Sequence, residues 1–440
     1  MRCVGLVLVI TTLAVSVCRL WSAPDNWREI LERVRQNVTR QVAKSVNYTC
    51  VQTVDRTSFA NTRDLLTGCA YESNQPDKRE IMHDRLRLDV AVSRGKEIHA
   101  WHGEGKFSGS SRIGDVVGRG TVSSGEFIGF LGNIFSRPGI RFEYAGEFTT
   151  NGEKTYSFNY TVPLSSSGYH VGTRHGNPVI PYHGSFSVRA ADFKLASLIV
   201  IADDIPKSSQ LCSVETEMQY QIANISGQES LIPALFILKV DDETHTYEVS
   251  RSEYSQCRAF GAESTIRFDG NGSSATGSAT APEREQFIPA GKVLQVGLRT
   301  PIDDRTSYTG DLVKGVLLRA VKLGGTPPVI PKGSEVRGVI TLLEDHQEPK
   351  HFHLLTIRWD ELSFGTTVLQ LRASPLPLKV NATKLIQIFG SLTPSVKDVY
   401  DRGVFVFRTP HFHLDESFSA YWKTETRPTS ADPAAGSSAQ

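Results

Sequence analysis

The sequence has almost no net charge. Its 440 residues include 48 Lys and Arg against 47 Asp and Glu, which leaves +1 at pH 7. No overall field therefore attracts nucleic acid or an anionic membrane, and we expect no nucleic-acid partner. Hydrophobic residues make up 39% and charged residues 22%, an ordinary globular composition that excludes wholesale disorder. The length predicts two or three domains of about 150 residues each.

The sequence also lacks the common motifs of several enzyme classes. No Gly-x-Ser-x-Gly elbow of the α/β hydrolases occurs. No Cys-x-x-Cys occurs either, so neither a redox dithiol nor a Cys-paired zinc site is supported. The glycines at 103 and 105 lack the spacing of a phosphate loop and predict a hairpin turn. The sequence therefore predicts no enzyme and no cofactor.

The longest apolar run near the N-terminus is short. Arg2 precedes residues 4–17, which carry no charge, and the small-residue pair Ser22-Ala23 comes after them. This order is typical of a secretory signal, whereas a transmembrane helix needs about 20 apolar residues. We predict a signal peptide at 1–23, export to the periplasm or the extracellular space, and no integral membrane segment after its removal. A retained anchor through Leu20, which would keep the protein membrane-associated, is the alternative.

Cysteine is scarce, but its placement is informative. Two of the six cysteines lie in the predicted signal, and the mature chain keeps Cys50, Cys69, Cys212 and Cys257. An even set in an oxidising compartment predicts two disulfides, with three pairings open and four free thiols as the alternative. A local pairing, first with second and third with fourth, would close loops of about 20 and 45 residues. Each would contribute about 3–4 kcal/mol in the loop-entropy model.

Hydrophobic periodicity predicts one helix followed by many strands. Apolar residues recur at spacings of three and four over 26–46, which predicts an amphipathic helix that packs across a sheet. Alternating, β-branched runs follow at 48–54 and 85–92, and turn signals then separate further short strands. Asn151-Gly152 predicts a hairpin. The apolar segment 125–135 predicts a small helix, either buried or a mobile lid.

The first part of this pattern resembles a known superfamily. The predicted helix, then Tyr48-x-Cys50-x-Gln52-x-Val54, Arg85-Leu-Arg-Leu and Gly95-Lys-Glu-Ile-His-Ala-Trp101, resembles the opening of the periplasmic lipoprotein carriers, which include LolA, LolB and RseB. The resemblance spans residues 24–268. It implies a half-open antiparallel barrel around helices, with an apolar cavity for acyl chains or a lipoprotein partner.

A run of small residues at 270–281 predicts a flexible linker, and a second β-rich block follows it. Within that block Ile288-Pro-Ala-Gly, Gly310-Asp-Leu-Val and Val329-Ile-Pro-Lys-Gly-Ser are similar to the β-barrel of TrbI-like proteins of conjugative transfer, which implies a small barrel. The predicted fold class is mainly β with an N-terminal helix (α+β). The predicted domains are a signal at 1–23, a carrier-like half-open barrel at 24–268, a linker at 269–285, a small β-barrel at 286–425 and a disordered tail at 426–440.

The tetrapeptide His-Phe-His-Leu occurs twice. In a strand, residues i and i+2 share one face, so each copy could present two imidazoles to Zn²⁺ while Phe points to the core. The metal candidates are His351, His353, His411 and His413, and the carboxylates that could complete a site are Glu344, Asp345 and Asp415. The plainer interpretation is that His alternates with buried Phe on solvated strand faces.

Aromatic residues of the first block could line a lipid-sized pocket. The candidates are Trp101, Phe127, Phe130, Phe135 and Tyr144. The alternative is that they fill an ordinary sheet-domain core. The leading hypothesis is an exported, non-enzymatic envelope protein that binds a lipid, a lipoprotein or an envelope partner. The alternatives are a metal-dependent hydrolase built on the two His-Phe-His strands and a structural assembly subunit.

Overall fold

The protein is described from a computed structural model. The described residues are 26–43, 47–60, 69, 79–93, 96–104, 107, 113–117, 120–124, 127–150, 152–172, 176–244, 246–260, 286–324, 329–348, 350–376 and 403–426. The predicted signal peptide and linker lie wholly outside these residues, as does all of the predicted tail except Thr426. Among the described residues no helix combines the length and the apolar character needed to cross a membrane.

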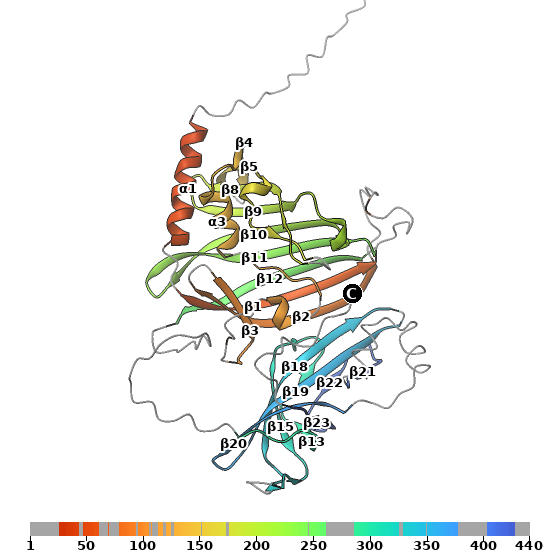
Figure 1. Cartoon of the computed structure of the whole chain (residues 1–440). Coiled ribbons are helices and arrows are strands. Elements are labelled where there is room, and N and C mark those ends of the chain that lie inside the picture. The colour runs from red at the N-terminus through yellow and green to blue at the C-terminus, as the bar shows by residue number, and fades with distance from the viewer. Residues whose placement is uncertain are drawn as a thin grey trace, which may run out of the picture.

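The chain is mainly β, and its first half forms an antiparallel sheet beside an N-terminal helix (Figure 1). Hydrogen-bonded neighbours follow the order β4-β5-β8-β9-β10-β11-β12-β1-β2-β3. The elements are α1 Trp27–Ala43, β1 Tyr48–Ala60, β2 Arg79–Ser93, β3 Lys96–Trp101, α2 Ile113–Val117, α3 Gly129–Ser136, β4 Arg141–Thr150, β5 Glu153–Val162, β6 Tyr169–His170, β7 Val179–Ile180, β8 Tyr182–Arg189, β9 Leu195–Ala202, β10 Leu211–Ile225, β11 Gln228–Asp242 and β12 Thr246–Ala259, with short 3-10 turns at Leu164–Ser166 and Lys207–Ser209. The predicted mainly β class with an N-terminal helix is confirmed.

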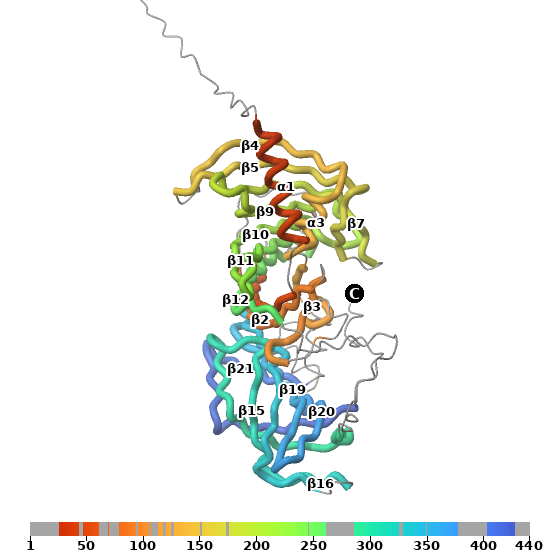
Figure 2. Tube along the Cα trace, turned by 90° about the vertical axis from the view of Figure 1, so that its left-hand side faces the viewer, coloured from red at the N-terminus to blue at the C-terminus, as the bar shows by residue number. Residues whose placement is uncertain are grey.

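Helix α1 lies where the spacing of apolar residues predicted it. Its buried residues Ile30, Val34 and Val38 recur every fourth position and so form one face. That face packs on α3 and on the sheet, as the side view of Figure 2 shows. The Nε of Arg35 donates a hydrogen bond to the carbonyl of Phe135 at 3.2 Å, which ties the two helices together.

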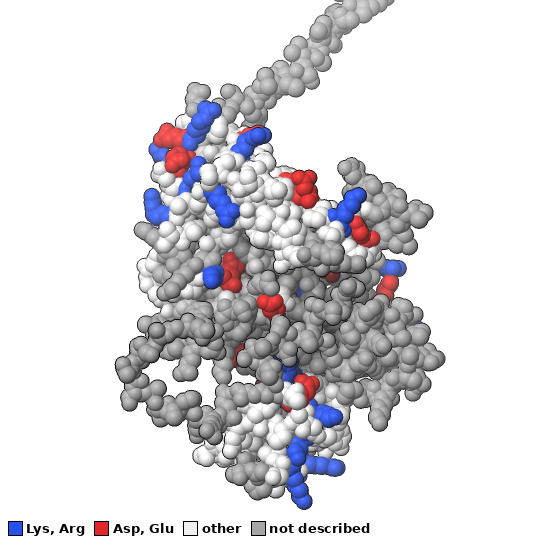
Figure 3. Space-filling model, viewed as in Figure 1, with Lys and Arg blue, Asp and Glu red and all other residues white. Residues whose placement is uncertain are grey.

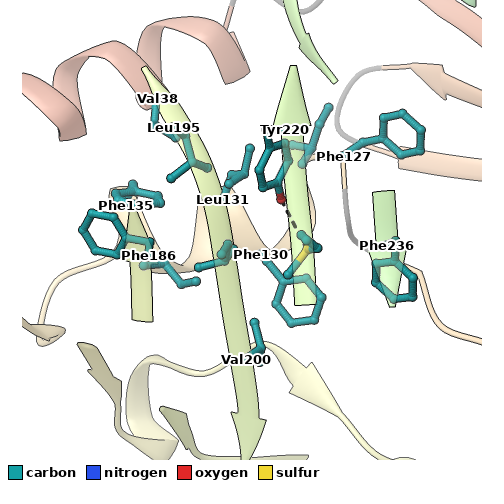
Figure 4. Close-up of a cluster of buried hydrophobic side chains, with 14 of the residues drawn as sticks. Val38, Phe127, Phe130, Leu131, Phe135, Phe186, Leu195, Val200, Tyr220 and Phe236 are labelled. Atoms are coloured by element: carbon teal, nitrogen blue, oxygen red, sulfur yellow. Dashed lines mark hydrogen bonds between the residues drawn. The ribbon is translucent and has the colours of Figure 1, made fainter. Parts of the chain in front are cut away.

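The apolar segment that includes α3 is part of the core, which decides between the two alternatives for it. Phe127, Phe130, Leu131 and Phe135 are each at most 4% exposed. In Figure 4 they lie among side chains of α1 and of the neighbouring strands. Burial of a large apolar side chain stabilises a fold by about 1.5–3 kcal/mol, so displacing this segment carries a substantial cost.

Strands of the second half pair in a closed circuit, in the order β13-β15-β18-β19-β20-β23 and back to β13. Its elements are β13 Val293–Leu298, β14 Ile302–Asp303, β15 Leu312–Leu317, β16 Val321–Lys322, β17 Val329–Ile330, β18 Glu335–His346, β19 Phe352–Phe364, β20 Thr367–Pro375, β21 Phe405–Phe407, β22 His413–Leu414 and β23 Ser419–Thr424. Trp359 and Trp422 are fully buried in the core of this half and meet edge to face, with ring centroids 5.5 Å apart. Gly338 approaches Trp359 so closely that an added Cβ would lie 2.8 Å from its ring.

The two halves are joined by strand pairing. The end of β18 pairs antiparallel with β2, and the two strands lie next to each other in Figure 1. Beside this contact the loop after β14 lies along β2: the Arg87 N–H donates to the Thr309 carbonyl at 2.8 Å, and the Thr309 N–H donates to the Arg85 carbonyl at 2.9 Å. Gly310 has φ +99°, and an added Cβ would lie 2.2 Å from the Arg87 carbonyl oxygen. We call this contact the junction.

Both disulfides link residues far apart in the sequence. Cys50 on β1 is bonded to Cys257 on β12, and Cys69 is bonded to Cys212 on β10. The prediction of two disulfides agrees with the structure, and the local pairing is not the one formed. The reason is the sheet order, since β1 lies between β12 and β2.

Candidate functional site

The first His-Phe-His segment begins one residue before β19 and places its two imidazoles side by side, as alternation predicts. The ring centroids of His351 and His353 are 4.9 Å apart. Phe352 points to the opposite side, where its ring stacks on His346 at 4.7 Å. Asp345 lies opposite His353 in the β18–β19 register. Its Oδ1 is 2.7 Å from Nε2 of His351 and 3.6 Å from Nε2 of His353.

A second carboxylate and a third imidazole approach from another part of the chain. The antiparallel pairing of β14 with β22 sets the turn after β14 beside the residues before β22. Asp304 Oδ2 consequently lies 3.1 Å from Nδ1 of His411 and 3.6 Å from Nε2 of His353. Asp304 Oδ1 accepts a hydrogen bond from the Phe412 N–H at 2.8 Å, which fixes the carboxylate. The Nε of Arg305 donates to Nδ1 of His411 at 3.2 Å.

We call these five residues the His–Asp cluster: Asp304, Asp345, His351, His353 and His411. His353 is its most buried member, at 1% exposure, and neither ring nitrogen has a hydrogen-bond partner in the described part of the chain. Burial lowers the pKa of His353, against the opposing effects of Asp345 and Asp304. The neutral imidazole, which has a free lone pair, is therefore favoured.

The other sequence candidates lie apart from this cluster. The structure corrects the hypothesis at His413, because its Nδ1 lies 3.2 Å from Asp303 instead of joining the other three histidines. Only two residues of the second His-Phe-His-Leu are in a strand, so its histidines do not share one strand face. Glu344 lies 2.8 Å from His346, and Asp415 accepts hydrogen bonds within its own turn. Asp345 alone of the three proposed carboxylates is in the cluster.

Sequence reasoning did not single out Asp304. It follows a short strand as the second of two consecutive aspartates, which is a common turn pattern and gives no sign of a site. Asp303 and His413 are 110 positions apart in the sequence, and the pairing of β14 with β22 brings them together. That pairing also places Asp304 next to His411.

The aromatic residues predicted to line an apolar pocket lie in two separate clusters. Phe127, Phe130 and Phe135 are in the core of the first half with Tyr144 packed against it, whereas Trp101 lies in a cluster at the junction. A small cavity of about 10 Å³ adjoins this core, room for about one water. Its lining comes from the end of α1, β1, α3 with the segment leading into it, and β11, and includes Gln41, Val42, Tyr48, Phe127, Leu131 and Leu231.

Comparisons with known proteins give only distant likenesses. No family model and no curated protein matches this chain. A crystal structure of a DUF1329 family protein from Desulfovibrio piger matches with a TM-score of 0.27 and 9% identity, over 54% of this chain and 94% of that one. A crystal structure of an outer membrane lipoprotein-sorting protein domain from Vibrio parahaemolyticus matches with a TM-score of 0.26 and 10% identity, over 52% of this chain and 92% of that one. Such low TM-scores carry no argument about function.

Proposed function

We propose that this protein is exported to the cell envelope and acts there as a non-enzymatic binding protein for an acyl chain or an envelope partner. In this proposal the first half is a half-open antiparallel barrel, the second half is a small β-barrel, and no residue is catalytic. The signal-like N-terminal pattern supports export. Two disulfides support it too, because they persist in oxidising compartments.

The observation that carries the proposal is the cavity that adjoins the aromatic core of the first half. Beside it the ring of Phe127 meets the ring of Tyr254 edge to face at 4.9 Å, in surroundings that would suit a hydrocarbon chain. Because the cavity has a volume of only about 10 Å³, a ligand enters when α1 shifts away from the sheet. Helix α1 packs against the sheet by side chains and belongs to no strand ladder, so its displacement breaks no strand pairing.

The surface near α1 suits neither nucleic acid nor an anionic membrane. Figure 3 shows Lys and Arg next to Asp and Glu over the upper part of the face in view. On α1 itself Arg33 and Glu29 form an ion pair at 2.7 Å. Interspersed charges of both signs give no strong field of one sign, in agreement with the net charge of +1.

The test is whether a ligand occupies this cavity. The full chain is expressed with its export signal and purified from the envelope fraction, and co-purifying lipid is extracted and identified by mass spectrometry. We expect acyl lipid with the wild type and a several-fold loss with Val42→Trp, whose indole would fill the cavity. Val329→Trp is the matched control, because Val329 is 42% exposed on the second half. Absence of lipid and of any co-purifying envelope protein from the wild type, or equal loss in both variants, would contradict the proposal.

A further inference from the structure

We propose that the His–Asp cluster is a structural binding site for a divalent cation of the zinc class. Asp345, His351 and His353 are its ligands, and Asp304 joins them by shifting toward the ion. The site lies next to the junction, in the second half of the chain. It does not depend on the proposed acyl binding, which concerns the first half.

The donor set matches the coordination chemistry of zinc. Zinc takes imidazole nitrogen and carboxylate oxygen, and imidazole also suits neighbouring first-row ions. Bonds of about 2.0–2.1 Å place the ligand atoms of a tetrahedral site about 3.3 Å apart. The Oδ1 of Asp345 lies 2.7 Å from Nε2 of His351 and 3.6 Å from Nε2 of His353. All three donor atoms lie within 4.8 Å of one another, so small shifts would give the tetrahedral spacing.

The buried ring of His353 independently points to a missing ligand. Its Nε2 faces Asp345 and Asp304, each at 3.6 Å, which is too long for a hydrogen bond. A polar nitrogen buried without a partner is unfavourable, and buried polar groups in native proteins are nearly always satisfied. A cation between this nitrogen and the two carboxylates would give the buried nitrogen a partner.

The origin of the ligands favours a structural role over a catalytic one. Asp304 lies 3.6 Å from Nε2 of His353 but outside the group of three donors that lie within 4.8 Å of one another, so it must shift toward the ion to become the fourth ligand of a closed structural site. His411 lies beside the site and accepts a hydrogen bond from Arg305. The Phe412 N–H holds Asp304 by its second oxygen, which is the kind of outer contact that orients metal ligands.

The site would brace the junction. Asp345 lies on the part of β18 that pairs with β2, opposite His83. Asp304 lies in the loop that packs along β2, where the Nη2 of Arg85 donates a hydrogen bond to the Asp304 carbonyl at 2.7 Å. A cation bound by both carboxylates therefore fixes two segments that each contact the first half of the chain.

The test measures Zn²⁺ binding to the tag-free full chain after treatment with a chelator, by calorimetric titration and elemental analysis. We expect one Zn²⁺ per chain and a rise of a few degrees in the melting temperature, because a ligand that binds only the native state stabilises it. His351→Ala and His353→Leu should each weaken Zn²⁺ binding by at least about tenfold. Loss of a hydrogen bond to a metal ligand already weakens binding by that much, and these variants remove a ligand itself. His413→Ala is the matched control, because His413 belongs to the other His-Phe-His and lies outside the cluster.

Two results would overturn the proposal. One is a wild-type chain that binds no Zn²⁺ at millimolar concentration, and the other is a His413→Ala variant that loses binding as strongly as His351→Ala. His351 is half-buried, so its replacement leaves the core intact even where His353→Leu disturbs folding. Where His353→Leu does fold, its metal-free melting temperature should equal or exceed that of the wild type, because the orphaned nitrogens are gone.

Discussion

At the scale of single residues, burial controls the protonation of the histidines. His99 on β3 is 1% exposed, and neither of its ring nitrogens has a hydrogen-bond partner in the part of the chain that the structure describes. Burial lowers the pKa of His99 to about 4. The folded protein therefore keeps this ring neutral over a pH range in which the unfolded chain, with an ordinary pKa of about 6.5, takes up a proton.

The pH dependence of stability follows from this difference. As the pH falls from about 6.5 to about 4, the unfolded state gains a proton that the folded state lacks, so His99 lowers the free energy of unfolding by up to about 3 kcal/mol. We expect His99→Leu to remove this part of the acid sensitivity and to leave stability at pH 7 equal or higher. Urea unfolding at a series of pH values measures both effects. The exposed His170→Leu should keep the wild-type slope, and an unchanged slope in His99→Leu would contradict the assignment.

At the scale of elements, the strands hold their register through turns and bulges at defined residues. The predicted Asn151-Gly152 hairpin is confirmed, because Thr150 pairs with Glu153 across it and Gly152 has φ +79°. The β1–β12 ladder shifts register between Thr49 and Val51, where Cys50 bonds to Cys257. This disulfide spans 207 residues and fixes a pair of strands that no local sequence signal would bring together.

The two disulfides should differ in their effect on stability. Removing the bridge of Cys50 and Cys257 by a double Ala replacement should lower the free energy of unfolding by about 5 kcal/mol, through a more flexible unfolded chain. Because Cys50 is 1% exposed, its loss also removes core packing. The double Ala variant of Cys69 and Cys212 is the matched control, with a smaller expected loss because Cys69 is exposed. Chemical denaturation gives both values. A peptide map without reductant that shows Cys50 bonded to Cys69 would refute the pairing.

At the scale of the whole molecule, the junction makes the two halves depend on each other. The guanidinium of Arg87 lies 2.7 Å from Asp311 and 4.0 Å from the ring centroid of Tyr308. Burial raises the pKa of Asp311, and the Arg87 charge opposes that rise. Leu86, Leu88 and neighbouring side chains of the first half pack with Val339 of the second. Strand pairing, an ion pair and apolar packing thus coincide at one contact.

This coupling predicts cooperative unfolding. We expect the wild type to melt in a single calorimetric transition, and Arg87→Ala to separate it into two because the half-buried Asp311 is left without its cation. The expected loss is about 2–3 kcal/mol of contact energy between the halves. Arg299→Ala is the control, since its ion pair with Glu416 lies on the surface of the second half. A wild type that already melts in two steps, or equal effects of the two variants, would argue against coupling.

Local sequence signals predicted the elements well and the long-range contacts poorly. The period of Ile30, Val34 and Val38 located α1, and alternation predicted that His351, just before β19, and His353 lie side by side. These signals act over a few residues, where backbone geometry alone decides which side chains share a face. The same alternation failed for His411 and His413, because the strand begins only at His413 and His411 precedes it.

The amino-acid sequence was sufficient to predict that the chain is mainly β with one leading helix and that four cysteines are available for two disulfides. The strand order that puts β1 between β2 and β12, the resulting bond between Cys50 and Cys257, and the approach of Asp304 to His353 become apparent only in the folded chain. The physical reason is that strand order and loop docking depend on the combined burial and hydrogen bonding of segments far apart in the chain. No short stretch of sequence contains that information.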